Sequence, residues 1–127
     1  MNIKNYCFSF NTYHEAVDII KTSKEKKLIP VIFLKYSLIN GFGIDWFIEL
    51  KDLLCKDFKG IDFKTYADTK NNYGLFLSLI ENKINYIKVK SNQEMFIKLS
   101  NIASANKVLI NPNFSIVGHS KFKKLIK

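Results

Sequence analysis

The chain has 127 residues, of which 47% are hydrophobic and 14% aromatic, and its formal net charge at pH 7 is +9. A length of this order fits a single domain, and this much apolar material excludes a globally disordered chain. The longest apolar stretch, residues 28–34, is interrupted by Pro30 and is far shorter than the roughly 20 residues that a membrane-spanning helix needs. The first residues also lack the apolar core of a secretion signal, so we expect a cytoplasmic protein.

The positive charge alone does not indicate a nucleic-acid-binding protein. All 20 basic residues are lysine, whereas arginine makes the most specific contacts with phosphates and guanine edges. The chain is also rich in Asn and Ile, which together with Lys is the bias of an AT-rich genome. We expect a solvated, lysine-rich surface and no nucleic-acid partner, with weak, non-specific polyanion binding as an alternative. Lysines are clustered only at the C-terminus of the chain. This predicts a domain over residues 1–117 and a basic tail over residues 118–127.

The two cysteines and the two histidines are isolated from one another. Cys7 lies in an expected strand and Cys55 in an expected helix, each among apolar residues and without Cys-x-x-Cys spacing. This pattern is typical of buried, reduced thiols in a cytosolic protein. His14 and His119 have no companion at metal-ligand spacing, and no cofactor fingerprint is present. The sequence therefore predicts neither a metal site nor a bound cofactor.

The first half of the chain alternates between strand and helix patterns. Residues 6–10 show the period-two alternation of a strand, and residues 12–15 form a capping box that begins a helix over residues 12–26. A continuous apolar run follows at residues 31–34 and is typical of a strand covered on both faces. The segment 37–43, which contains two glycines, is expected to be a loop.

A broad apolar face after Gly43 predicts a second helix, which Gly60 ends. Residues 61–67 alternate in polarity and predict a third strand, and the helix after it ends near residue 82. The apolar face of the second helix consists of Trp46, Phe47, Leu50, Leu53, Leu54 and Phe58.

The same alternation continues toward the C-terminus. Residues 86–90 predict a fourth strand, and residues 91–94 form a second capping box before a further helix. Residues 108–110 predict a last short strand, which Asn111 and Pro112 stop. The apolar side chains expected on the helix after the second capping box are Met95, Phe96, Leu99, Ile102 and Ala103.

The order of elements is therefore βαβαβαβαβ, with short connections. Parallel strands need helical crossovers of this kind, and such crossovers are right-handed in nearly all proteins. This predicts an α/β fold with a three-layer, mostly parallel sheet of flavodoxin-like type. A (βα)4 half-barrel is the alternative, because the alternation of elements leaves the strand order open.

Polar side chains collect where the expected parallel strands end, which is where α/β proteins bind their ligands. Asp68 ends a strand just before a helix, so it is a candidate catalytic or ion-binding carboxylate, or else a helix cap or turn residue. Lys35 and Lys90 are candidate catalytic residues, because a desolvated lysine can form a Schiff base with a carbonyl substrate. Lys88 also lies on a strand, and its place opposite the apolar side chains predicts exposure. The candidate ligand-binding residues at these strand ends are Tyr36, Ser37, Asn71, Ser91 and Asn111.

Several short motifs lie between residues 30 and 103. They are Pro30-Val31 on a strand, Gly43-x-x-Trp46-Phe47 entering a helix, Ala67-Asp68 ending a strand, Tyr73-Gly74-Leu75 opening a helix and a closing helix around Leu99 to Ala103. In these motifs the chain resembles a family of small uncharacterised bacterial α/β proteins. Members of that family carry a Cys-Gly element around the acidic residue, whereas Ala67 and Thr69 flank Asp68 here. The resemblance implies the α/β fold and no particular activity.

The sequence contains no complete catalytic constellation, whereas several aromatic residues are available for an interface. We therefore expect a small cytosolic, non-catalytic binding or assembly module that acts through protein–protein contacts. A small lyase-like or aldolase-like enzyme that uses Asp68 and a strand-end lysine is the alternative. An open parallel sheet leaves two edge strands, for which residues 6–10 and 108–110 are candidates. We therefore expect another protein as the partner, most simply a second copy of the chain in a homo-oligomer.

Overall fold

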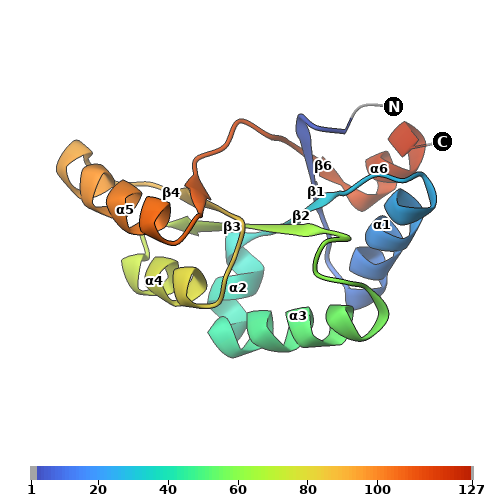
Figure 1. Ribbon diagram of the computed structural model, residues 1–127, viewed down its shortest axis with the longest axis horizontal. Helices are drawn as coiled ribbons and strands as arrows, with labels where there is room; N and C mark the ends of the chain where they lie inside the picture. Colours follow the sequence, from blue (N-terminus) through green and yellow to red (C-terminus); the bar gives the residue numbers. More distant parts are fainter. Residues whose placement is uncertain (1–2, 127) are drawn as a thin grey trace.

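Strands and helices alternate along residues 3–126, the part of the chain that the structure, a computed structural model, describes (Figure 1). None of the helices in these residues has both the length and the apolar character needed to cross a membrane. The strands are β1 (Tyr6–Ser9), β2 (Val31–Leu34), β3 (Lys64–Lys70), β4 (Tyr86–Val89), β5 (Leu109–Ile110) and β6 (Ser115–Gly118). The helices are α1 (Tyr13–Glu25), α2 (Tyr36–Phe42), α3 (Ile44–Asp57), α4 (Tyr73–Glu81), α5 (Gln93–Ala105) and α6 (His119–Ile126).

The six strands form one parallel sheet with the order β5-β4-β3-β2-β1-β6. This confirms the predicted α/β fold with alternating elements and a parallel sheet, and it is consistent with a flavodoxin-like fold. Strands β1 to β5 lie side by side in the sheet in the same order as in the chain. The half-barrel alternative would have the same order for these strands. The direction of winding reverses once, where β6 pairs with the free side of β1.

The helices cover one face of this sheet. Consecutive right-handed crossovers that move in one direction along a sheet place their helices on the same face. In agreement, the buried apolar residues of every helix belong to one hydrophobic core, together with Phe8, Ile32, Ala67 and Ile87 of the strands. The largest fully buried helix side chains are Ile19, Ile20, Ile39, Phe47, Leu54, Phe76, Leu79 and Phe122.

The opposite face of the sheet is covered by chain that is not helical. Cys7, Phe33 and Tyr66 belong to a second, smaller hydrophobic cluster on this face. The connection from β5 to β6 crosses it, on the side away from α2, α3 and α4 (Figure 1). The ring of Phe114, in this connection, lies 5.0 Å from Tyr86 and 5.8 Å from Tyr66, centroid to centroid. The third layer of the fold is therefore this connection.

Side-chain caps fix where α1 and α4 begin. The Thr12 half of the predicted capping box at α1 is present, because the Glu15 N–H donates to the Thr12 hydroxyl at 3.2 Å. The Glu15 carboxylate in turn accepts from the Asn11 N–H at 3.2 Å. At α4, Asn72 accepts from the Leu75 N–H at 3.0 Å. Each cap satisfies an amide that the helix itself leaves without a partner.

The capping box predicted for residues 91–94 is wrong. Asn92 directly precedes α5 and has an extended backbone, with a φ of −73° and a ψ of 170°. Its side chain accepts from the Met95 N–H at 2.8 Å, so Asn92 is the cap. Ser91 lies one residue too early to reach the first turn, and its hydroxyl takes no part in the cap.

Three helices end in the same way, with a lysine in the left-handed backbone region. Lys27, Lys83 and Lys107 follow α1, α4 and α5, with φ values of 59°, 60° and 60°. The apolar residue after each lysine donates its N–H to a carbonyl five residues earlier, which is the Schellman motif. This arrangement turns the chain back into the core just before the next strand or its lead-in. The three bonds run from Leu28 to Ser23 at 2.8 Å, from Ile84 to Leu79 at 3.4 Å and from Val108 to Ala103 at 2.9 Å.

The prediction of a loop over residues 37–43 is wrong, because most of this segment lies in α2. Ile39 anchors this short helix, since its side chain is fully buried in the main core. Gly43, with a φ of 81°, then ends α2 and begins α3. The sequence predicted a loop here because glycines are typical of loops, although Leu38 and Ile39 lie in a helix.

The third strand begins at Lys64, later than the predicted start at Ile61. A turn occupies the intervening residues, because the Asp62 carboxylate accepts from the Lys59 N–H at 2.8 Å. Ile61 is 76% exposed in this turn. The strand also continues beyond its predicted end, as far as Lys70.

The segment predicted as a basic tail is folded. Strand β6 pairs with β1, and α6 follows it directly. Phe122 of α6 is fully buried, and its ring meets that of Phe8 edge-on at 4.7 Å between centroids. Residues 118–126 therefore pack as part of the domain, whereas Lys127 lies outside the described residues.

A polar contact also holds α6 against α1. His119 Nε2 lies 2.6 Å from Asp18 Oδ2, and Lys123 Nζ lies 3.7 Å from the same oxygen. Burial opposes the ionisation of Asp18, but the His119 hydrogen bond and the Lys123 charge outweigh it and hold the pKa of Asp18 below its usual value. A carboxyl group whose pKa is lowered on folding stabilises the fold while it is ionised. This contact therefore supports α6 at neutral pH and is lost in acid.

The edges of the sheet are β5 and β6. One of the two expected edges is therefore present, whereas β1 lies inside the sheet between β2 and β6. Each edge strand exposes an apolar side chain, with Leu109 of β5 65% exposed and Ile116 of β6 50% exposed.

Removing the ring of Phe122 tests whether α6 is part of the core. We expect Phe122→Ala to destabilise the domain by about 3–5 kcal/mol, because a fully buried aromatic side chain is lost. The control Lys121→Ala, at an exposed neighbour, should stay within about 0.5 kcal/mol of the wild type. Urea unfolding measures both variants, and an unchanged midpoint for Phe122→Ala would contradict the packing of α6.

Candidate functional site

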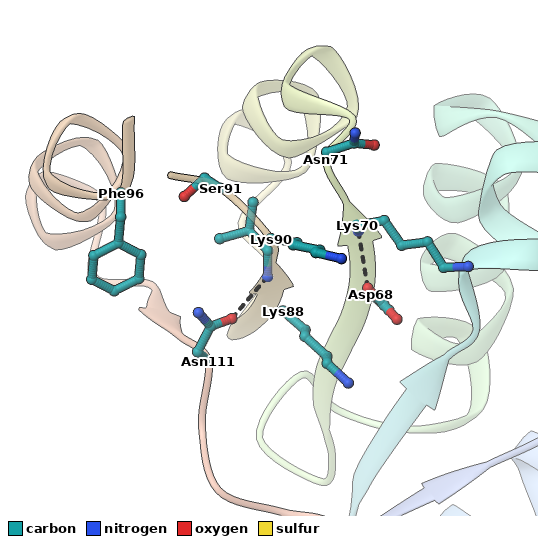
Figure 2. Close-up of a pocket in the computed structure, with 9 residues that line it drawn as sticks. Asp68, Lys70, Asn71, Lys88, Lys90, Ser91, Phe96 and Asn111 are labelled. Carbon is teal, nitrogen blue, oxygen red and sulfur yellow. Dashed lines mark hydrogen bonds between the residues drawn. The ribbon is translucent and has the colours of Figure 1, made fainter. Parts of the chain in front are cut away.

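A cavity of about 680 Å³ lies at the carboxyl ends of β3, β4 and β5 (Figure 2). Ligands of parallel α/β sheets bind at this end of the strands. The helices α4 and α5 begin beside it, so the positive ends of two helix dipoles lie at this edge of the sheet. The lining residues are Asp68, Lys70, Asn71, Lys88, Val89, Lys90, Ser91, Phe96 and Asn111.

A bulge in β3 sets the positions of Asp68 and Lys70. The pairing between β3 and β4 shifts register between these two residues. Lys70 takes up a left-handed backbone, with a φ of 48°, and its N–H donates to Asp68 Oδ1 at 2.9 Å. Thr69, which is fully buried, donates its hydroxyl to the Lys88 carbonyl at 3.0 Å. The bulge is therefore held on both sides, and it turns the end of β3 toward the cavity.

Asn111 joins the ends of β4 and β5 across the floor of the cavity. Its backbone N–H donates to the Ile87 carbonyl at 2.8 Å, and its Oδ1 accepts from the Val89 N–H at 2.8 Å (Figure 2). The φ of Asn111 is 50°, a left-handed conformation that Asn tolerates better than most residues. With the oxygen engaged, the carboxamide N–H groups remain as donors.

Positive charge dominates the cavity. Lys70, Lys88 and Lys90 line it together with a single carboxylate, that of Asp68, and of these lysines Lys70 directs its ammonium away from the other two, toward Tyr36 (Figure 2). Figure 2 shows Lys88 and Lys90 extending toward β3, on either side of Asp68 in that view. Within residues 3–126, no carboxylate forms an ion pair with any of the three ammonium groups. The site therefore has an excess of hydrogen-bond donors and of positive charge.

The other side of the cavity is less polar. Phe96, in the first turns of α5, is 38% exposed and lies across the cavity from the Asp68 carboxylate (Figure 2). The Ser91 hydroxyl oxygen is buried and has no hydrogen-bond partner within residues 3–126. A buried hydroxyl without a partner is costly to the fold.

The structure brings five of the eight sequence-predicted site residues into one cavity. Lys35, Tyr36 and Ser37 are not among its lining residues, because β2 ends one strand further from it. Lys35 Nζ instead donates to Asn11 Oδ1 at 2.8 Å. Tyr36 adjoins the site indirectly, since Lys70 Nζ lies 5.1 Å from the centre of its ring. The five residues in the cavity are Asp68, Asn71, Lys90, Ser91 and Asn111.

Lys70 lies in the strand-end segment that the sequence placed at the site but was not singled out as a candidate residue, whereas Phe96 was missed. Lys70 enters through the bulge, which no sequence pattern marks. Phe96 is one of the apolar residues assigned to the buried face of its helix, but only Leu99 and Ala103 of that helix are buried. The position of Phe96 in the first turn, beside the end of β4, is the signal that would have placed it at the strand ends.

The cysteines contribute nothing to this site. Burial raises the pKa of the Cys7 thiol to about 12, so this thiol stays protonated at neutral pH. Cys7 is buried as predicted, whereas Cys55 is exposed on α3, where it faces away from Leu50 and Leu54.

A second cavity of about 570 Å³ lies at the opposite end of the sheet. It contains no amide or hydroxyl side chain apart from the Tyr86 phenol. Its polar members are Lys4, Lys27, Lys64 and Tyr86. The first cavity is the better candidate site, because several different hydrogen-bonding side chains converge there.

The chain matches no protein-family model, and no curated protein matches it significantly. The resemblance to small bacterial α/β proteins therefore stays a prediction.

Two alanine substitutions test the hydrogen bonding beside the cavity. Asn92→Ala should destabilise the protein by about 1 kcal/mol, because it removes the cap of α5. Ser91→Ala should leave the stability unchanged or raise it slightly, because the hydroxyl that it removes is buried without a partner. Thermal unfolding at neutral pH compares the two variants, and the reverse ranking would restore Ser91 as the cap.

Proposed function

We propose that the protein is a small binding module whose strand-end cavity holds a small anionic molecule. The observation that carries this proposal is the pair of Lys88 and Lys90 at one cavity with a single carboxylate, while the Lys70 ammonium extends away toward Tyr36 (Figure 2). Ammonium groups without counter-charges repel one another, and a bound anion relieves that repulsion. Phosphate and carboxylate groups are the anions that lysine and free amide donors recognise.

The dimensions and the surroundings of the cavity support a small molecule as the ligand. A volume of about 680 Å³ falls within the roughly 300–1,000 Å³ that is usual for small-molecule sites. The N-termini of α4 and α5 favour negative charge at the same edge. The anion is therefore attracted by side chains and by backbone dipoles together.

The enzyme alternative is supported less well. A lysine that forms Schiff bases is activated by removal from water, but Lys88 and Lys90 are exposed. Lys35 lies outside the cavity and is hydrogen-bonded to Asn11. Asp68, the remaining candidate, accepts from the Lys70 N–H and so has the structural role of a turn residue. Binding without catalysis is thus the function that the geometry supports best.

Self-association is a second candidate function, and the edge strand β5 favours it. Leu109 of β5 and Ile97 and Ile102 of the adjacent α5 are 65%, 55% and 37% exposed. An edge strand beside exposed apolar side chains is a surface on which a second copy can pair. Light scattering at micromolar concentration tests this candidate, and a monomeric mass that persists as the concentration rises would exclude it.

Replacing lysines of the cavity tests the proposed ligand class. We expect inorganic phosphate to bind the wild type, and each of Lys88→Gln and Lys90→Gln to weaken binding about tenfold, as for the loss of one charge-assisted hydrogen bond of about 1.5 kcal/mol. The matched control is Lys98→Gln, which removes an exposed lysine of α5 that does not line the cavity. Isothermal titration calorimetry at low ionic strength measures the affinities.

The control decides how the result is interpreted. Equal weakening by Lys98→Gln would mean that phosphate responds to the net charge of the protein, which is the weak polyanion alternative. Unchanged binding in both cavity variants would refute the proposed site.

A further inference from the structure

The strand-end cavity has two chemically different sides. Lys88 and Lys90 extend toward β3 on one side, whereas the ring of Phe96 forms the other (Figure 2). Phe96 contacts no other aromatic ring within residues 3–126 and is 38% exposed. The face of this ring is therefore available for stacking, a geometry that aromatic groups prefer when they pair.

Hydrogen-bond donors lie between the two sides. The Asn111 carboxamide has its oxygen engaged by the Val89 N–H, which leaves its N–H groups for a ligand. A ligand that spans the cavity therefore meets the lysines and the Asn111 N–H groups as donors, and a flat apolar surface at one end.

From this arrangement we infer that the ligand joins a planar aromatic ring to an anionic group, either a phosphate or a carboxylate. The inference deepens the proposed function and rests on it, because the anionic group is the one that the lysines hold. A bare anion would leave Phe96 exposed, and an uncharged ring would leave the lysines without a counter-charge. Only a molecule with both parts satisfies both sides of the cavity.

Matched pairs of probes separate the contribution of the ring from that of the anion. The first pair is phenyl phosphate and methyl phosphate, and the second is phenylacetate and acetate. We expect the aromatic member of at least one pair to bind about fivefold more tightly than its aliphatic counterpart, the gain typical of aromatic stacking. The pair with the tighter aromatic member identifies the anionic group. Titrations by NMR or calorimetry at low ionic strength give the affinities.

Substitution of Phe96 tests whether the ring advantage arises in this cavity. In Phe96→Leu, which keeps an apolar side chain at an exposed position, the aromatic and aliphatic probes should bind equally. The control is Ile97→Ala, at a neighbouring exposed residue that does not line the cavity, and it should retain the advantage. Melting temperatures close to that of the wild type verify that both variants are folded.

The outcomes separate this inference from the proposed function. Equal binding of both members of each pair by the wild type, or an advantage that survives in Phe96→Leu, would overturn the aromatic ligand. Lysine-dependent binding of methyl phosphate or acetate would then leave the anion site standing. If none of the four anions bound, the inference and the proposed function would fall together.

Discussion

Because every helix packs on the same face of the parallel sheet, the opposite face has to be closed by something other than a helix. Phe114, in the connection from β5 to β6, supplies this cover by packing on Tyr66 and Tyr86. Phe114 lies beside the first residues of β2, β3 and β4, and a cavity remains at the carboxyl ends of β3 and β4. The long polar side chains that extend from the ends of β3 and β4 therefore line an open cavity instead of a helix interface.

The same constraint explains why the cavity carries so much unpaired charge. Lys88 lies on the face without helices, so no helix supplies a carboxylate to it. The bulge at Thr69 and the Asn111 link hold the ends of the strands in place without using the lysines. Rigid backbone and free ammonium groups together are the features that a binding site for a small anion requires. The proposed function follows from this combination. The exposed ring of Phe96 further restricts the class of ligand to molecules with an aromatic ring.

Much of the fold could be predicted from local patterns. The strand–helix alternation, the Thr12 cap and the end of α4 all depend on residues close together in the chain. The position of β6 could not be predicted, because its partner β1 lies at the other end of the chain. The site was predicted in part, since residues at strand ends are brought together by any parallel sheet. Lys70 and Phe96 were not singled out because a bulge and a helix orientation, which are tertiary features, put them in the lining of the cavity.

The central claim is that an anion binds at the carboxyl ends of β3 and β4. Titration of ¹⁵N-labelled protein with inorganic phosphate, followed by amide chemical shifts, tests this claim directly. The account predicts saturable shifts that are largest in residues 68–71 and 88–91 and in the Asn111 carboxamide. Shifts concentrated at residues 27–31, beside the second cavity, or an absence of saturable shifts would contradict it.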